Sequence, residues 1–276
     1  MSVNRSDKEL AFLHDLYVEG EWGERFAELI DEHVEPPKQG RGLYVAAGTG
    51  GHALKIAERA ERAFTLIGVD EHAERVEIAR AKAAAAGLKG QTDFRVTQLE
   101  TLDFEDDQFE LVVGDASLVA AERLPEMLAE MARVAAPGGT VALALPTASS
   151  HGEFFSVYWE AMLNAGLGDR SGIVEDLITG QPTITDAEEW AAREGLEAVR
   201  SWTNVAEFTY ASAEEFFAAP LVKDFLLGLW LEPIEDESAH ERVVTAAAAI
   251  IDEERAESPF VLSIKATLVV GRKPSD

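Results

Sequence analysis

The chain has 276 residues, of which 47% are hydrophobic, and its 51 acidic against 24 basic residues give a formal net charge of −27. This length and composition favour a folded globular protein and argue against disorder. The acidity disfavours nucleic acid and anionic membrane surfaces as partners, and the absence of cysteine excludes disulfides and thiolate metal sites. No apolar run reaches bilayer length and residues 1–17 lack a signal-peptide core, so we expect a cytoplasmic protein.

The first half of the chain predicts helices followed by alternating strands and helices. Residues 7–34 are expected to form two amphipathic helices, the first ending near Gly20. Five buried strands are then predicted at residues 42–47, 64–70, 92–99, 109–116 and 140–146. Helices are predicted between them at residues 52–63, 71–88 and 121–135, and the "PGG" of residues 137–139 is expected to end the last of these.

The second half is less regular. Residues 151–193 are predicted to be mostly helical with a break at "TGQPT", residues 196–212 to form a long strand, residues 212–257 to be helical and residues 260–274 to form a final strand. The alternation predicts an α/β protein with a Rossmann-like, doubly wound, mostly parallel seven-stranded sheet, an antiparallel closing strand and a helical cap. We expect one domain over residues 1–276, with an N-terminal helical cap (1–40), a cofactor-binding core (41–150) and substrate-side helices and closing strands (151–276).

A glycine-rich turn follows the first predicted strand. The stretch "LYVAAGTGG" ends in Gly48 and Gly50, which let a backbone pass close to a ligand, and Gly48–Ala53 satisfies the pattern G-x-G-x-x-A. Asp70 ends the second strand about 20 residues later, where an acid can accept hydrogen bonds from a ribose diol. The turn alone therefore fits a dinucleotide or another nucleoside cofactor.

The ordered set of segments resembles the class I S-adenosylmethionine-dependent methyltransferases, of the small-molecule type with a methyltransferase type 11-like domain. The resemblance covers residues 41–146 and rests on the first motif "LYVAAGTGG", the second strand "LIGVD", the stretch "FRVTQLETLDFEDDQFELVV" and "LPEMLAEMARVAAPGGTVALALP". The last strand also resembles the terminal antiparallel strand of that family. The resemblance implies S-adenosylmethionine as cofactor, S-adenosylhomocysteine as product and methyl transfer to a small molecule.

The family pattern also assigns cofactor-binding positions. It places Ala46, Ala47, Gly48, Thr49 and Gly50 against the methionine and ribose, Asp70 and Glu71 at the ribose hydroxyls, Gln98 and Leu99 at the adenine, and Gly114 and Asp115 where donor meets acceptor. Two positions depart from the pattern. Tyr44 stands where the family usually has an acid that helps hold the positive methionine end, and Gln98 stands where an acid often accepts from the adenine amine.

The acceptor side is expected after the fifth strand. His151 is the candidate general base, because imidazole titrates near neutrality, and Phe154 and Tyr158 are candidates for an apolar substrate pocket. A surface histidine and core aromatics are the competing interpretations, and no metal site is expected. Two other functions stay open: a methyltransferase-fold binding module without catalysis, which Tyr44 favours, and an NAD(P)-dependent oxidoreductase, which the glycine pattern and Asp70 alone favour.

Overall fold

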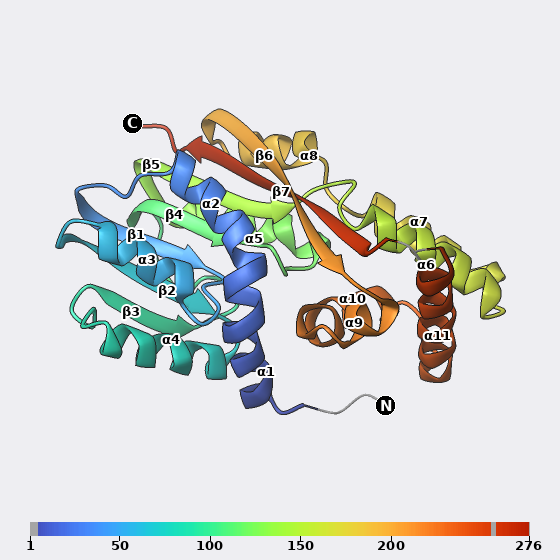
Figure 1. Ribbon diagram of the computed structural model, residues 1–276. Coiled ribbons are helices and arrows are strands. Elements are labelled where there is room, and N and C mark those ends of the chain that lie inside the picture. Colours follow the sequence, from blue (N-terminus) through green and yellow to red (C-terminus); the bar gives the residue numbers. More distant parts are fainter. Residues whose placement is uncertain (1–4, 255–257, 276) are drawn as a thin grey trace. The chain divides into compact units, whose positions relative to one another are not determined.

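The computed structural model describes residues 5–254 and 258–275 and divides into two compact units (Figure 1). The first unit runs to Leu145 and adds Ile184–Asn204 and the segment from Ala266. The second unit consists of Pro146–Thr183 and Val205–Lys265. The predicted subdivision into residues 1–40, 41–150 and 151–276 stays a prediction.

A seven-stranded sheet organises the chain. Its strand order is β3-β2-β1-β4-β5-β7-β6, and the strands are β1 (Gln39–Val45), β2 (Ala63–Asp70), β3 (Thr92–Val96), β4 (Phe109–Asp115), β5 (Ala135–Pro146), β6 (Glu197–Tyr210) and β7 (Phe260–Arg272). β1 pairs in parallel with β2 and β4, β2 with β3, and β4 with β5. The predicted Rossmann-like, mostly parallel sheet with an antiparallel closing pair is confirmed.

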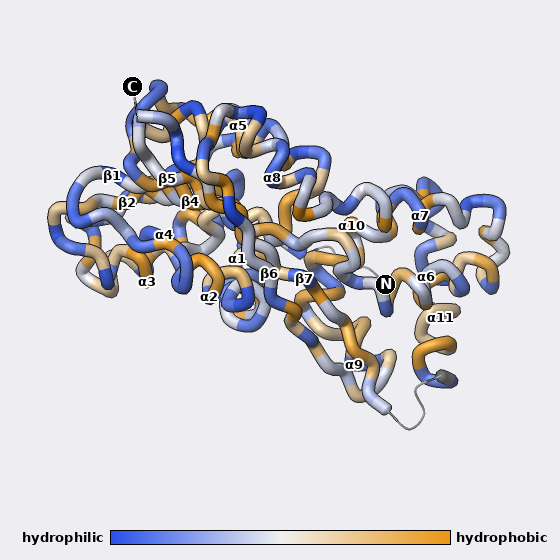
Figure 2. The backbone as a smooth tube through the Cα atoms, turned by 90° about the horizontal axis from the view of Figure 1, so that it is seen from above, coloured by the Kyte–Doolittle hydropathy of each residue, from blue (hydrophilic) through white to orange (hydrophobic). Residues whose placement is uncertain are grey.

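Helices cover both faces of the sheet in the first unit. α3 (Gly51–Arg59) and α4 (Ala73–Ala85) pack against β2 and β3, whereas α5 (Leu124–Val134) packs against β4 and α8 (Ile184–Arg193) (Figure 1). Leu43 and Val45 join the α5-side core, so their neighbour Tyr44 projects to the α3 side. Strongly hydrophobic and strongly hydrophilic stretches alternate along the chain, as expected for buried strands between amphipathic helices (Figure 2).

The N-terminal helices differ from the prediction. α1 (Asp7–Leu13), the π-helical segment η1 (His14–Trp22) and α2 (Gly23–His33) follow one another without a break, so the expected end near Gly20 is wrong. A Cβ built on Gly20 would meet no atom within 4 Å, and the helical backbone continues through this residue. π-Helical turns are rare, and those that occur are often found at functional sites, so η1 is a candidate part of the site.

The "PGG" segment is also placed differently. α5 ends at Val134, before it, and Pro137–Gly139 lies inside β5 rather than at the end of the helix. Phe109 pairs with Ala135 but Leu111 pairs with Thr140, so β5 carries extra residues opposite β4 at this point. Gly138 has φ +76°, a conformation that glycine adopts readily. The segment is therefore a bulge within a strand.

The second unit is mainly helical. Its helical elements are α6 (Gly152–Asn164), η3 (Gly168–Arg170), α7 (Gly172–Thr179), α9 (Ala213–Ala218), η4 (Val222–Leu226), α10 (Leu227–Leu231) and α11 (Glu237–Glu254). The helices predicted for residues 151–193 and 212–254 are confirmed, while residues 255–257 lie outside the described part. None of the described helices is long and apolar enough to cross a membrane.

Candidate active site

The glycine turn connects β1 to α3 through a strained backbone. Ala46, Gly48 and Gly50 have φ values of +57°, +55° and +82°. The turn is held by hydrogen bonds from the Ala47 N–H to the Val69 carbonyl and from the Gly50 N–H to the Ala47 carbonyl, both 2.8 Å. Left-handed backbone at a non-glycine residue such as Ala46 costs free energy, and such residues cluster at binding sites. The five residues predicted for the cofactor therefore form one turn at the end of β1.

Asp70 ends β2 beside this turn. Its Oδ2 accepts a hydrogen bond from the Gly48 N–H at 2.9 Å, and its Oδ1 accepts from the His72 N–H at 3.0 Å. The carboxylate is 4% exposed. Burial raises the pKa of Asp70, but hydrogen bonds from His72 and the nearby Arg75 guanidinium outweigh it, so the pKa lies below its usual value. Asp70 is an ionised acceptor tied to the glycine turn, and acceptor positions remain on its oxygens.

Tyr44 is buried, and its neutral hydroxyl does not supply the negative charge that an acid would carry at this position. Its hydroxyl lies 2.9 Å from His52 Nδ1, and His52 Nε2 lies 2.9 Å from an Asp31 carboxylate oxygen, which also binds Arg59. Because a carboxylate only accepts, the imidazole donates from Nε2 and accepts the Tyr44 proton at Nδ1. Burial raises the pKa of Tyr44 well above its usual value, so the hydroxyl stays neutral. The first strand thus places no negative charge at the turn.

Replacing Tyr44 by Phe should lower the free energy of unfolding by about 1 kcal/mol, because His52 Nδ1 loses its buried partner. Urea denaturation measures the difference. Tyr17→Phe is the matched control, since that side chain is 42% exposed. If Tyr44→Phe lowered the free energy of unfolding no more than Tyr17→Phe does, the buried Tyr44 hydroxyl would contribute no stability beyond that of an exposed one.

The π-helical segment lies over the turn, which sequence reasoning missed. Glu19 Oε1 accepts from both the Thr49 N–H and the Thr49 hydroxyl at 2.9 Å, and Asp15 Oδ1 lies 2.7 Å from the same hydroxyl. A Cβ built on Gly48 would lie 2.6 Å from the His14 ring. The four-residue spacing of Asp15 and Glu19 was the available signal, because it places both acids on one helix face.

The residues after β4 form the next part of the site. A Cβ on Gly114 would lie 2.8 Å from Met131 Sδ, so a larger residue here would require the Met131 side chain on α5 to shift. Asp115 Oδ1 accepts from the Ser117 N–H at 3.1 Å, and burial raises the pKa of Asp115. The carboxyl groups of Asp115 and Glu19 repel each other enough for Asp115 to raise the pKa of Glu19. These two acids therefore belong to one negatively charged region.

The remaining predicted cofactor residues differ in surroundings. Glu71 is held by Arg123, with contacts of 2.6 and 3.0 Å, and Arg123 also binds Glu100. Gln98 is exposed and Leu99 is buried in the α5-side core. Glu71 is therefore a salt-bridge partner of Arg123. The role predicted for Glu71 at the ribose, and those predicted for Gln98 and Leu99 at the adenine, stay predictions.

The acceptor-side candidates lie in the second unit. His151 precedes α6 with φ +61°, its N–H donates to the Ser263 carbonyl at 2.7 Å, and burial lowers the pKa of its imidazole to about 4. Phe154 stacks on Trp230 and Tyr158, with ring centroids 4.3 and 5.6 Å apart. The Tyr158 hydroxyl donates to the Trp230 carbonyl at 2.9 Å. His151 is neutral near pH 7, and both aromatic rings are fully buried.

Comparison with known proteins agrees with this geometry. Residues 43–139 match the family model described as a methyltransferase domain. They are a class I methyltransferase domain. The match begins on β1 and ends in the β5 bulge, so the methyltransferase domain contains the glycine turn, Asp70 and Asp115. The resemblance found from the sequence is confirmed.

Relatives of the methyltransferase domain carry different activities. A ubiquinone/menaquinone biosynthesis C-methyltransferase from Geotalea daltonii is 36% identical over 104 residues, which are 38% of this chain and 44% of the relative. Ajmaline N-methyltransferase from Rauvolfia serpentina is 31% identical over 116 residues, 42% of this chain and 38% of the relative. The chain thus spans less than half the length of these curated relatives.

Solved structures extend the likeness in fold beyond the methyltransferase domain. The YcgJ protein from Bacillus subtilis superimposes with a TM-score of 0.59 at 18% identity, covering 92% of this chain and all of that one. At this identity the likeness concerns the fold alone.

Proposed function

We propose that the protein transfers a methyl group from S-adenosylmethionine to a small-molecule acceptor. The observation that carries the proposal is the buried, ionised Asp70 tied to the glycine turn inside a methyltransferase domain. When bound, the cofactor supplies an electrophilic methyl group on a positively charged sulfonium. Asp70 would accept from the ribose hydroxyls, and the turn Ala46–Gly50 would lie along the ribose and methionine.

The charges of the site suit this cofactor. In the part of the chain that the structure describes, neither Glu19 nor Asp115 forms an ion pair, although both are partly buried. Burial raises the pKa of both carboxyl groups, so a positively charged ligand would favour their ionised forms. A sulfonium or ammonium group meets that requirement. Among the described residues no group of three or more His, Asp and Glu side chains is placed to hold a metal ion.

His151 and two aromatic residues are the candidates on the acceptor side. His151 stays our candidate base, although a pKa of about 4 makes its neutral imidazole a weak one. Phe154 and Tyr158 stay candidates for the acceptor pocket. The C- and N-methyltransferases among the relatives show that the matched domain accompanies more than one acceptor atom. A cytoplasmic location also stays a prediction.

The alternatives make different predictions. A binding module with this fold would bind the cofactor or a partner without turnover, and an oxidoreductase would bind NAD. The neutral Tyr44 favours the binding module only if no other acid binds the positively charged methionine end of the cofactor. The methyltransferase domain disfavours the latter.

Calorimetric titration tests the proposal. We expect S-adenosylmethionine and S-adenosylhomocysteine to bind with micromolar dissociation constants and NAD to give no heat of binding. Titrations at low and at molar KCl separate the cofactor question from any salt requirement for folding of so acidic a chain. No binding of either ligand by the folded protein at either salt level would contradict the proposal.

A further inference from the structure

We infer that Glu19 of the π-helical segment η1 supplies the negative charge that β1 lacks, and that it binds the α-ammonium group of the cofactor. This inference rests on the proposed function and assigns a residue outside the matched residues 43–139. It accounts for the missing acid on β1, where Tyr44 stands in place of the usual carboxylate and hydrogen-bonds to His52.

The Glu19 carboxylate lies against the glycine turn. Glu19 Oε1 accepts from the N–H and the hydroxyl of Thr49, the central residue of the glycine turn. Oε2 lies so close to Gly51 that a Cβ there would overlap it. Glycine at the first residue of α3 therefore leaves the space that this carboxylate occupies.

The Glu19 carboxylate has unused hydrogen-bonding capacity. Oε2 of Glu19 carries no hydrogen bond within residues 5–254 and 258–275. The Thr49 hydroxyl has one proton and lies within reach of both Asp15 and Glu19, so it can serve only one of them at a time. Glu19 thus has room for a donor that the chain does not provide.

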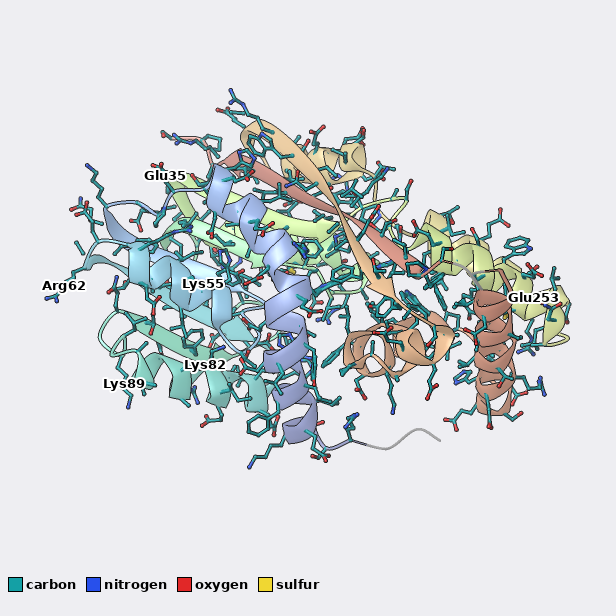
Figure 3. All side chains as sticks on the ribbon, in the orientation of Figure 1. Glu35, Lys55, Arg62, Lys82, Lys89 and Glu253 are labelled. Carbon is teal, nitrogen blue, oxygen red and sulfur yellow. The ribbon has the colours of Figure 1, made fainter. Side chains whose placement is uncertain are left out.

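The acids around the glycine turn are not fully balanced by positive charge. Lys82 of α4, labelled in Figure 3, lies 2.7 Å from Asp15 and neutralises that acid. Burial raises the pKa of Glu19, repulsion from Asp115 and Asp15 adds to it, and Lys82 offsets only part. An ammonium group with three N–H donors would complement both the charge and the free oxygen.

Calorimetry with two ligands tests the inference. S-Adenosylhomocysteine carries the α-ammonium group, whereas 5′-methylthioadenosine has the same nucleoside and lacks the amino-acid part. Glu19→Gln should weaken binding of the first about tenfold or more and change binding of the second less than threefold. Glu21→Gln makes the same charge change at an exposed position of η1 and should alter neither.

A second variant tests position rather than charge. Gly51→Ala keeps Glu19 but displaces its carboxylate, a flexible end that can move without unfolding the chain. Gly51→Ala should also lower the affinity for S-adenosylhomocysteine about tenfold and leave the affinity for 5′-methylthioadenosine nearly unchanged. Thermal melting of each variant without ligand checks that the fold is kept.

The outcomes separate the inference from the proposed function. If the wild type binds neither nucleoside, the proposed cofactor is wrong. If the wild type binds S-adenosylhomocysteine and Glu19→Gln binds it equally well, only the role of Glu19 is wrong. Tighter binding by Glu19→Gln would show that the carboxylate occupies the cofactor's place, which also overturns the inference.

Discussion

Replacing Asp70 by Ala should reduce the affinity for S-adenosylhomocysteine about 100-fold. Two hydrogen bonds from ribose hydroxyls to a charged carboxylate contribute about 1.5 kcal/mol each or more, and about 3 kcal/mol corresponds to that factor. The Gly48 N–H would also lose its acceptor, which loosens the glycine turn. S-Adenosylhomocysteine and 5′-methylthioadenosine share the ribose, so Asp70→Ala should lower the affinity for both equally. Glu19→Gln, by contrast, should lower mainly the affinity for S-adenosylhomocysteine.

Asp93→Ala is the control for this experiment. Asp93 lies on β3 and binds Arg95, and its side chain is 52% exposed, so its removal should leave binding unchanged. Calorimetry gives the affinities and thermal melting reports the fold. An Asp70→Ala protein that melts normally and keeps the wild-type affinity would show that the ribose is held elsewhere.

Replacing Phe154 by Ala should destabilise the second unit by about 3–5 kcal/mol, the usual cost of removing a buried phenylalanine ring. The ring is 1% exposed and contacts Tyr158, Phe216 and Trp230. Neighbouring rings cannot fill the space without leaving their own contacts. Urea denaturation followed by tryptophan fluorescence measures the loss.

Trp159→Ala on the same helix is the matched comparison. Its side chain is 40% exposed, so we expect a change below about 1 kcal/mol. A small effect at both positions would mean that the cluster adapts to a missing ring, which is the behaviour of an acceptor pocket rather than of a core. The pair of variants therefore also tests the substrate-pocket prediction for Phe154.

The regular part of the fold could be predicted because its signals are local. Apolar runs such as "FTLIGVD" and "FELVVGDA" specify strands buried on both faces, and the helices between them specify parallel pairing. The glycine turn and Asp70 were found for the same reason, since each sits at the end of such a run. The long final strand was also clear, because apolar residues predominate among the thirteen residues of β7 and buried positions alternate with partly exposed ones in its first half.

The parts that sequence reasoning missed depend on contacts between distant residues. Glu19 and Thr49 are 30 residues apart, and nothing in "HDLYVEGEW" distinguishes a π-helical turn from an α-helical one. Tyr44 could not be interpreted without His52 and Asp31, because a tyrosine fits a core and a polar site equally well. "PGG" signals a break in a helix, yet the same residues suit a bulge once β4 fixes the pairing.

The π-helical segment has a consequence for how this protein could change over generations. A single-codon deletion at Gly20, where the surroundings are open, would remove one residue from the wide π-helical turns, so that this segment would close toward an ordinary α-helix. α2 would keep its packing, while the loss of the π-helical turns would change the positions of Asp15 and Glu19 relative to Thr49. Two proteins with identical residues 43–139 would then differ in cofactor affinity through one lost codon upstream, a difference that a comparison restricted to the matched domain would not detect.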